Sequence, residues 1–330
     1  MDKVIIESVP NFSVARDTNV VEGIAKTMQS IYGLKLLHVD VGIDANRTVF
    51  TLAGHPHKVC EALFQATKFA IAHIDMQLHQ GNHPRIGALD VCPLIPISGI
   101  TISELLVYAE QLGARLGKEL NIPVYFYESS AKSSKRKNLA DIRRGEYEGL
   151  EEKMKQKEWL PDNGISFNSR TGATVLGVRN FLLAYNVNLE TKETMVAKAI
   201  AATIRASGYT DFQNGQAVHH PGSLKGVKAI GWYVEEFQCC QVSTNITNIE
   251  ENSIASVFNA CKAEAKKFGV SVNSSELIGL IPKKAVDDAA NHLGIITTNE
   301  KDKWDMVSQA LGLNIKESFD FQQRIIENLL

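Results

Sequence analysis

The order of predicted strands and helices constrains the fold most, because the same order occurs twice along the chain. In the first half, β-branched runs at 4–9, 34–41, 48–53 and 86–95 alternate with segments of helical periodicity at 20–31 and 58–74. The second half has strand patterns at 173–189, 227–235, 241–247 and 277–281 and helical patterns at 193–206 and 251–268. Each half therefore predicts a β-α-β-β-α-β unit, in which helices cover one face of a sheet and leave the other free.

The chain length agrees with two such units. At 330 residues the chain can form two cores, and we expect a first subdomain over 1–172 and a second over 173–330. The predicted fold class is α/β (α+β), with two similar ferredoxin-like subdomains and a ligand cleft between them, since ligand sites concentrate at domain interfaces. A helix at 103–120 and a strand at 124–127 extend the first unit. Segment 128–172 has too little apolar periodicity for a core, and 297–330 predicts two helices with a break near Gly312.

Composition and charge exclude several classes of protein. The 35 Lys and Arg residues against 37 Asp and Glu residues give a net charge of −2, which argues against a general nucleic-acid binder. The N-terminus places Asp2 and Glu7 around a short apolar run, so we expect neither a signal peptide nor a membrane anchor. None of the five cysteines has C-x-x-C spacing, which favours reduced thiols in a cytoplasmic protein and no metal site.

Segment 79–90, HQGNHPRIGALD, concentrates groups that can carry chemistry. A histidine takes and gives protons near neutral pH, because its unperturbed pKa is about 6.5. Pro84 disfavours the helical conformation at His83 and so fixes that residue in an extended loop, which suits a proton carrier. By itself, the segment is better explained by a hydrogen-bonded surface histidine than by a catalytic one.

Two further segments are candidates for a site. His38 and Asp40 alternate along one predicted strand and therefore face the same way, so Asp40 could orient an imidazole, whereas Asp44, Asn46 and Thr48 are typical turn residues. The polar loop Gly164–Gly172 has small side chains and backbone amides that can receive a flat heterocycle or an anion. The adjacent His219 and His220 are expected in a loop and do not indicate a metal site. No Rossmann, P-loop, zincin or nucleophile-elbow motif is present.

Taken in order, several longer strings resemble the glutamate formiminotransferase family, the amino-terminal transferase part of formiminotransferase-cyclodeaminase. They are ESVPNFS at 7–13, NRTV at 46–49, HPR at 83–85 with GALDVCP at 87–93, PVY at 123–125, RGEYE at 144–148, GATV at 172–175 and AIGWY at 229–233. The resemblance runs from about residue 3 to residue 330. It implies two similar subdomains in a homodimer, and a stand-alone form without the cyclodeaminase domain, whose product would need a separate cyclodeaminase.

The activity that the resemblance implies is transfer of the formimino group from N-formimino-L-glutamate to tetrahydrofolate, giving L-glutamate and 5-formimino-tetrahydrofolate in histidine degradation. Tetrahydrofolate is then a co-substrate, and no metal is implied. The resemblance makes His83 the catalytic proton shuttle and Asp40 its acidic assistant. Arg85, and less directly the basic segment 132–144, are candidates for binding substrate carboxylates. The residues that match the folate-contacting loop are Gly164, Ile165, Ser166, Phe167, Asn168, Ser169, Arg170, Thr171 and Gly172.

The chain also departs from the family pattern near the expected folate site. Val14 and Ala15 replace an acid and a glycine of the family, and Asn163-Gly164-Ile165 replaces a Phe-Gly-Pro string. Arg170-Thr171 stands where an aromatic residue precedes the last glycine of the loop. These differences leave two alternatives open: a catalytically altered relative that binds folate without transfer, and a transferase that uses formiminoglycine as the donor.

Overall fold

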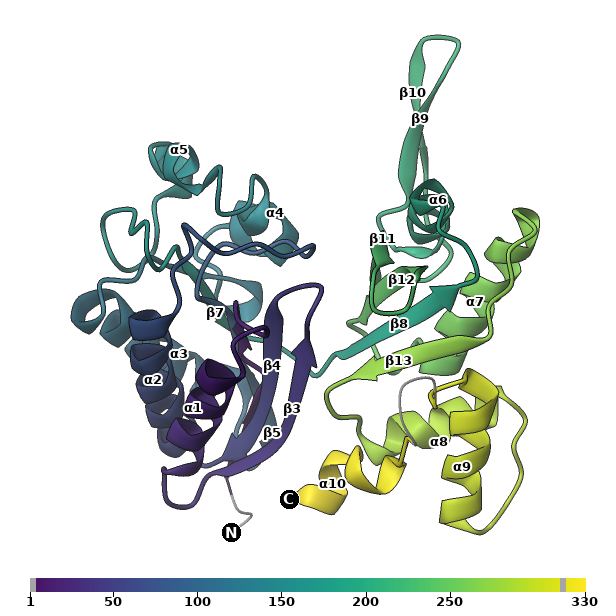
Figure 1. Ribbon diagram of the computed structural model, residues 1–330, viewed down its shortest axis with the longest axis horizontal. Coiled ribbons are helices and arrows are strands. Elements are labelled where there is room, and N and C mark those ends of the chain that lie inside the picture. Colours follow the sequence, from purple (N-terminus) through teal and green to yellow (C-terminus); the bar gives the residue numbers. More distant parts are fainter. Residues whose placement is uncertain (1–3, 315–318) are drawn as a thin grey trace. The chain divides into compact units, whose positions relative to one another are not determined.

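The computed structural model describes residues 4–314 and 319–330 (Figure 1). The chain divides into two compact units, Met1–Asn180 (unit 1) and Phe181–Leu330 (unit 2). Each unit has its own hydrophobic core, and the buried residues of the two largest cores come from one unit each.

Unit 1 contains the six predicted elements in the predicted order. These are β1 (Ile5–Ser8), α1 (Thr18–Gln29), β3 (Lys35–Gly42), β4 (Arg47–Gly54), α2 (Pro56–His73) and β5 (Leu89–Ser98). Strand β1 pairs antiparallel with β4 on one side and β5 on the other, and β3 pairs with the far edge of β4, so the order is β3-β4-β1-β5. After Pro10, the short β2 (Asn11–Phe12) continues between β4 and β5.

Unit 1 extends this sheet by two strands. Helix α3 (Ile102–Glu119) begins with a capping box at Thr101 and leads to β6 (Val124–Phe126). Strand β7 (Thr174–Val178) then runs parallel to both β5 and β6 and lies between them. Helices α1, α2 and α3 lie together on one side of the sheet, where their apolar residues pack with Phe50, Leu52 and Leu94 (Figure 1).

The segment 128–172 has a core, contrary to the expectation from its sequence. Its short helices α4 (Leu139–Arg143) and α5 (Leu150–Met154) bury Ile142, Leu150 and Met154 in one cluster with Tyr125 and Val175. Because each helix is only five residues long, the apolar residues never repeat often enough to show a period. Three 3-10 helices complete the segment: Glu128–Ser130, Ser134–Arg136 and Lys157–Trp159.

Unit 2 repeats the strand order of unit 1. Its elements are β8 (Leu183–Leu189), α6 (Thr194–Ile204), β11 (Val227–Val234), β12 (Cys239–Ile246), α7 (Ile254–Lys267) and β13 (Ser274–Ile278). The antiparallel order β11-β12-β8-β13 corresponds to β3-β4-β1-β5 of unit 1. The predicted fold class of two similar α+β subdomains is therefore confirmed.

The structure differs from the expected second half in two details. The single strand predicted over 173–189 is two strands in different sheets, β7 and β8, separated by the polar residues Arg179 and Asn180. Because β7 pairs with β5 and β6, the compact units divide after Asn180, on the C-terminal side of the boundary expected at 172/173.

A hairpin was also missed. Strands β9 (Tyr209–Gln213) and β10 (Gln216–His220) project beyond the rest of unit 2, and they place His219 and His220 in a strand rather than a loop (Figure 1).

The C-terminal part packs on unit 2 as expected. Helices α8 (Lys283–His292), α9 (Glu300–Leu311) and α10 (Ile326–Leu329) and the 3-10 helix Phe321–Gln323 lie there. Helix α9 ends at Gly312, whose left-handed conformation terminates it, so the predicted break is confirmed. Trp304, Val307 and Phe321 join the core of unit 2. Within 4–314 and 319–330, no helix is both long and apolar enough to span a membrane, and the five cysteines are free thiols.

Candidate functional site

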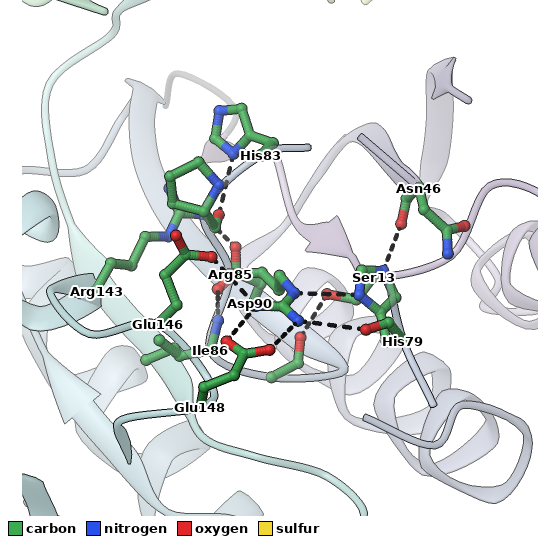
Figure 2. Close-up of polar contacts among 12 residues, drawn as sticks. Ser13, Asn46, His79, His83, Arg85, Ile86, Asp90, Arg143, Glu146 and Glu148 are labelled. Atoms are coloured by element: carbon green, nitrogen blue, oxygen red, sulfur yellow. Dashed lines mark hydrogen bonds and ion pairs between the residues drawn. The ribbon is translucent and has the colours of Figure 1, made fainter. Parts of the chain in front are cut away.

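His83 lies in the loop between α2 and β5, and its ring contacts the Arg47 guanidinium and the Pro84 carbonyl. The guanidinium nitrogen Nη1 of Arg47 is 2.8 Å from the His83 Nδ1 atom and 3.3 Å from Nε2. The carbonyl oxygen of Pro84 is 3.0 Å from Nδ1 (Figure 2). The side chain is half-buried. Arg47 is the first residue of β4, which starts after the turn at 43–46.

The surroundings of His83 disfavour its protonation. Burial, followed by the positive charges of Arg47 and Arg143, lowers the pKa of His83 well below its usual value, and the hydrogen bond to the Pro84 carbonyl only partly opposes this. Burial and Arg143 also lower the pKa of Arg47, to about 10, so that Arg47 remains a cation at neutral pH. His83 is therefore a neutral imidazole at neutral pH, able to accept a proton.

Asp40 is connected to this site through Arg47. It lies on β3, and its Oδ2 atom is 3.7 Å from Nε2 of His38, in agreement with the shared face expected for these two residues. In the pairing of β3 with β4, Gly42 lies opposite Arg47, so Asp40 is two residues from the position that faces Arg47. The negative charge of Asp40 raises the pKa of Arg47, against the larger effect of burial.

Arg85 is engaged by protein groups on all of its nitrogens. Its Nη1 and Nη2 atoms donate to the two carboxylate oxygens of Glu148, at 2.8 and 2.6 Å, and Nη1 also reaches Glu146 at 3.2 Å. Its Nε atom donates to Nδ1 of His79 at 3.2 Å, and Nη2 to the His79 carbonyl at 3.3 Å (Figure 2). The Arg85 side chain is only 8% exposed. A substrate carboxylate would therefore have to replace Glu148 on this guanidinium.

A pocket of about 530 Å³ opens beside Arg85. It is lined by one stretch before Arg85 and by the turn that carries the two glutamates, and its residues are His79, Gln80, Gly81, Asn82, Arg85, Gly145, Glu146 and Glu148. Asn82 lines this pocket, and the candidate proton carrier His83 is the next residue in the sequence.

Arg143 ties the inserted segment to the start of β5. It forms an ion pair with Asp90, whose side chain is fully buried and whose Oδ1 accepts a hydrogen bond from the Ile86 amide at 2.9 Å (Figure 2). Other cations of the basic segment 132–144 also form ion pairs within the protein: Lys132 with Glu110, Lys135 with Glu158, Arg136 with Asp162 and Arg144 with Asp141.

The loop Gly164–Gly172 lies against the strand that follows His83. Gly172 forms a bridge with Gly87, and the Ala88 amide donates to the Thr171 carbonyl at 2.8 Å. Inside the loop, the side chain of Asn168 accepts from the amides of Arg170 and Thr171, each at 3.2 Å. The structure therefore brings the predicted folate loop and the His83 segment together within unit 1.

An aromatic ring of the loop, Phe167, lies near a second one outside it, Tyr147. The Tyr147 hydroxyl donates to the Ser169 carbonyl at 2.5 Å, and its ring centre is 6.0 Å from that of Phe167. Ile165 is almost fully exposed. These apolar groups offer stacking surface even though Arg170-Thr171 replaces the aromatic residue of the family pattern.

Sequence reasoning missed Arg47 and the role of Asn46. The Asn46 side chain accepts from the amides of Ala15 and Arg16, at 3.0 and 3.3 Å, and donates to the Gln80 carbonyl at 3.1 Å. Its own carbonyl accepts from Nε2 of His79 at 2.9 Å. Asn46 thus joins three segments, whereas the sequence suggested only a turn residue that satisfies its own backbone. Its left-handed backbone, with φ of 45°, agrees with that turn.

Among the residues that the structure describes, no group of three or more His, Cys, Asp or Glu side chains is arranged to hold a metal ion.

Comparison with known proteins gives the family. The formiminotransferase domain, N-terminal subdomain, matches residues 5–179, and the formiminotransferase domain matches residues 184–330. The chain is 42% identical to the formimidoyltransferase-cyclodeaminase of Mus musculus over 99% of its length, and it spans 60% of that protein. It is 39% identical to the glutamate formimidoyltransferase of Streptococcus pyogenes serotype M1, with 99% of this chain and 98% of that protein covered. A glutamate formimidoyltransferase of Thermoplasma acidophilum is 37% identical, covering 87% and 91%. The chain belongs to the formiminotransferase family.

Proposed function

We propose that this protein transfers the formimino group of N-formimino-L-glutamate to tetrahydrofolate and releases L-glutamate and 5-formimino-tetrahydrofolate. Similarity over nearly the whole length of a relative named glutamate formimidoyltransferase supports the activity. The observation that carries the proposal is the environment of His83, a neutral imidazole on a fixed loop whose preceding residues 79–82 line a pocket. The reaction needs such a group, because one nitrogen must lose a proton and another must gain one.

The proposed mechanism is an addition followed by an elimination. The N5 nitrogen of tetrahydrofolate attacks the amidine carbon, so that an N5–C bond forms and a tetrahedral intermediate results. His83 takes the proton that N5 then carries and gives it to the glutamate nitrogen, whose bond to the same carbon breaks. His83 ends as it began. Asp40 contributes negative charge on the Arg47 side of the imidazole, which we propose eases formation of the imidazolium.

We propose that the loop Gly164–Gly172 holds the folate. Its contact with the strand after His83, and the nearby rings of Tyr147 and Phe167, support this assignment. Arg85 remains a candidate for a substrate carboxylate only if Glu148 is displaced from it. Its saturated contacts favour instead a role in holding His79 and the turn with Glu146 and Glu148.

We further propose a homodimer that works in the cytoplasm, within histidine and one-carbon metabolism. The free thiols of the five cysteines support a reducing compartment. Size-exclusion chromatography with light scattering tests the dimer, and a monomer at micromolar concentration would contradict it.

The decisive assay of the activity incubates the purified protein with tetrahydrofolate and either formiminoglutamate or formiminoglycine, and follows 5-formimino-tetrahydrofolate. We expect product with formiminoglutamate, and a higher kcat/KM for it than for formiminoglycine. A preference for formiminoglycine would reassign the donor. Measurable folate binding without product from either donor would identify a folate-binding relative and refute the transferase.

A further inference from the structure

The contact between Arg47 and His83 restricts the protonation state of the imidazole. A guanidinium keeps its proton at any ordinary pH, so Arg47 is a permanent positive charge beside the ring. Its Nη1 atom is close to both ring nitrogens at once, 2.8 Å from Nδ1 and 3.3 Å from Nε2, and therefore lies over the ring rather than in line with one lone pair. The Pro84 carbonyl, 3.0 Å from Nδ1, can accept a proton carried by that nitrogen. A second proton on the ring would place another positive charge directly against the guanidinium, so the contact favours a neutral His83.

The charges near His83 act in the same direction. Arg47 comes from β4 and Arg143 from α4, and both positive charges oppose a third charge on the imidazole. Arg143 is paired with the buried Asp90, and Asp40 acts on Arg47, so each cation has a carboxylate near it. Arg47 has a nitrogen 2.8 Å from the ring atom Nδ1, so protonation of the ring would bring two positive charges into direct contact.

Arg47 and His83 are both held in place by the same residue. Asn46 precedes Arg47 and ties the segment before His83 through bonds to Gln80 and His79. Gly81 also packs so closely on the turn that an added Cβ would lie 2.1 Å from the Ala45 carbonyl oxygen. The contact is therefore fixed by backbone packing on both sides rather than by two flexible side chains meeting.

We infer that Arg47 is a positioning residue that keeps His83 a neutral imidazole, so that His83 enters the reaction as a base and, once protonated, acts as an unusually strong acid. The second half of this inference rests on the proposed function. When N5 adds to the amidine carbon, N5 becomes positively charged and its proton is acidic, so a weak base is sufficient to remove it. The glutamate nitrogen must then be protonated before it leaves. An imidazolium that lies against the Arg47 guanidinium gives up its proton readily to that nitrogen.

Substitution of Arg47 tests the inference on the histidine itself, without any substrate. NMR titration of the His83 ring, assigned by its loss in His83→Gln, gives the midpoint directly. In the unmodified protein we expect a midpoint clearly below 6.5. In Arg47→Gln, which removes the charge and keeps a polar side chain, the midpoint should rise by about 1 pH unit, as is typical of a neighbouring charge. Arg47→Lys, which keeps the charge, should restore most of the low midpoint.

The control is Arg115→Gln on α3, whose guanidinium pairs with Glu61 and Glu119. It should leave the His83 midpoint unchanged. In parallel, the acidic limb of the kcat/KM profile should move to higher pH in Arg47→Gln, while kcat at neutral pH falls because the imidazolium has become a weaker acid. Arg47→Lys should keep the limb of the unmodified enzyme even if misplacement of its ammonium lowers kcat.

A His83 midpoint at or above 6.5 in the unmodified protein would overturn the inference, and so would an unchanged midpoint in a folded Arg47→Gln. If Arg47→Gln does not fold, the inference is decided by the His83 midpoints of the unmodified protein and of Arg47→Lys. These readings are independent of turnover. A protein that shows the midpoint shift but transfers no formimino group would refute the proposed function and leave the effect of Arg47 on His83 standing.

Discussion

At the scale of single residues, Glu7 on β1 is a buried carboxyl whose surroundings oppose its ionisation. Its side chain is 1% exposed, and its Oε2 atom has no hydrogen-bond partner among the described residues. Burial raises the pKa of Glu7 to about 7, and the charge of Arg179 only partly offsets this. The folded state therefore binds the proton more tightly than the unfolded chain, whose carboxyl has a pKa of about 4.3. Stability from this group is greatest at low pH and is lost as the pH rises towards 7.

We expect Glu7→Gln to stabilise the protein at pH 8, because glutamine occupies the same space without having to ionise. The gain should be about 3–4 kcal/mol at pH 8 and about 1 kcal/mol at pH 5, following about 1.4 kcal/mol for each unit of pKa difference. Urea unfolding at the two pH values measures it. Glu22→Gln on the exposed face of α1, where Glu22 pairs with Lys26, is the matched control and should show no such dependence on pH. A gain independent of pH would contradict the account of Glu7.

At the scale of elements, the contact between the loop Gly164–Gly172 and the strand after His83 depends on glycine. Gly172 has a φ of +63°, and a Cβ added there would lie 2.1 Å from the Ile86 carbonyl oxygen. Gly33 has a φ of +83°, but a Cβ added there would have no other atom within 4 Å beyond its chain neighbours. The two positions therefore share a backbone conformation that suits glycine and differ in the space around it.

We predict that Gly172→Ala separates the loop from the strand and weakens folate binding, whereas Gly33→Ala costs only its backbone strain. That strain is about 1 kcal/mol, and the clash at Gly172 should raise the loss of stability to roughly 2–4 kcal/mol. Thermal unfolding and folate titration of both variants provide the comparison. Equal losses in the two variants, with unchanged folate affinity, would show that the close approach at Gly172 is unimportant.

The core elements of both units were predictable, while contacts between distant segments were not. Strands such as β4 and β12 have an alternating or a continuous apolar sequence pattern, and α2 has a clear apolar face. Local sequence patterns therefore predicted these elements. The hairpin β9–β10 was missed although Asn214-Gly215 is a strong signal for its turn, because its strands are polar and exposed.

The candidate site shows the same division. His83 and Asp40 were candidates by residue type and position, and the resemblance to the family, not local chemistry, gave them their roles. Arg47 could not be paired with His83, since 36 positions separate them and only the packing of the β4 turn on the loop brings them together. The full occupation of Arg85 by Glu148 and Glu146 was equally invisible, because those glutamates lie more than 60 residues away.

At the scale of the whole molecule, the two units have separate cores. Phe50 is fully buried in the core of unit 1, and Ile200 is fully buried in that of unit 2. We expect Phe50→Ala to cost about 3–5 kcal/mol and Ile200→Ala about 2–5 kcal/mol, each mainly in its own unit. Native-state hydrogen exchange should show faster exchange in β4 and β5 for Phe50→Ala, and in α6 and β11 for Ile200→Ala. If either variant accelerated exchange equally in both units, the protein would unfold as one cooperative body.

The central claim for the molecule is that His83 carries the proton in formimino transfer. The most direct test compares kcat for 5-formimino-tetrahydrofolate formation in His83→Ala with that of the unmodified protein and of His219→Ala, a control on the exposed hairpin. The account predicts that His83→Ala loses about 10²–10⁴ in kcat and keeps its folate affinity and fold, whereas His219→Ala remains fully active. Turnover by a folded His83→Ala within a few fold of the unmodified protein would contradict it.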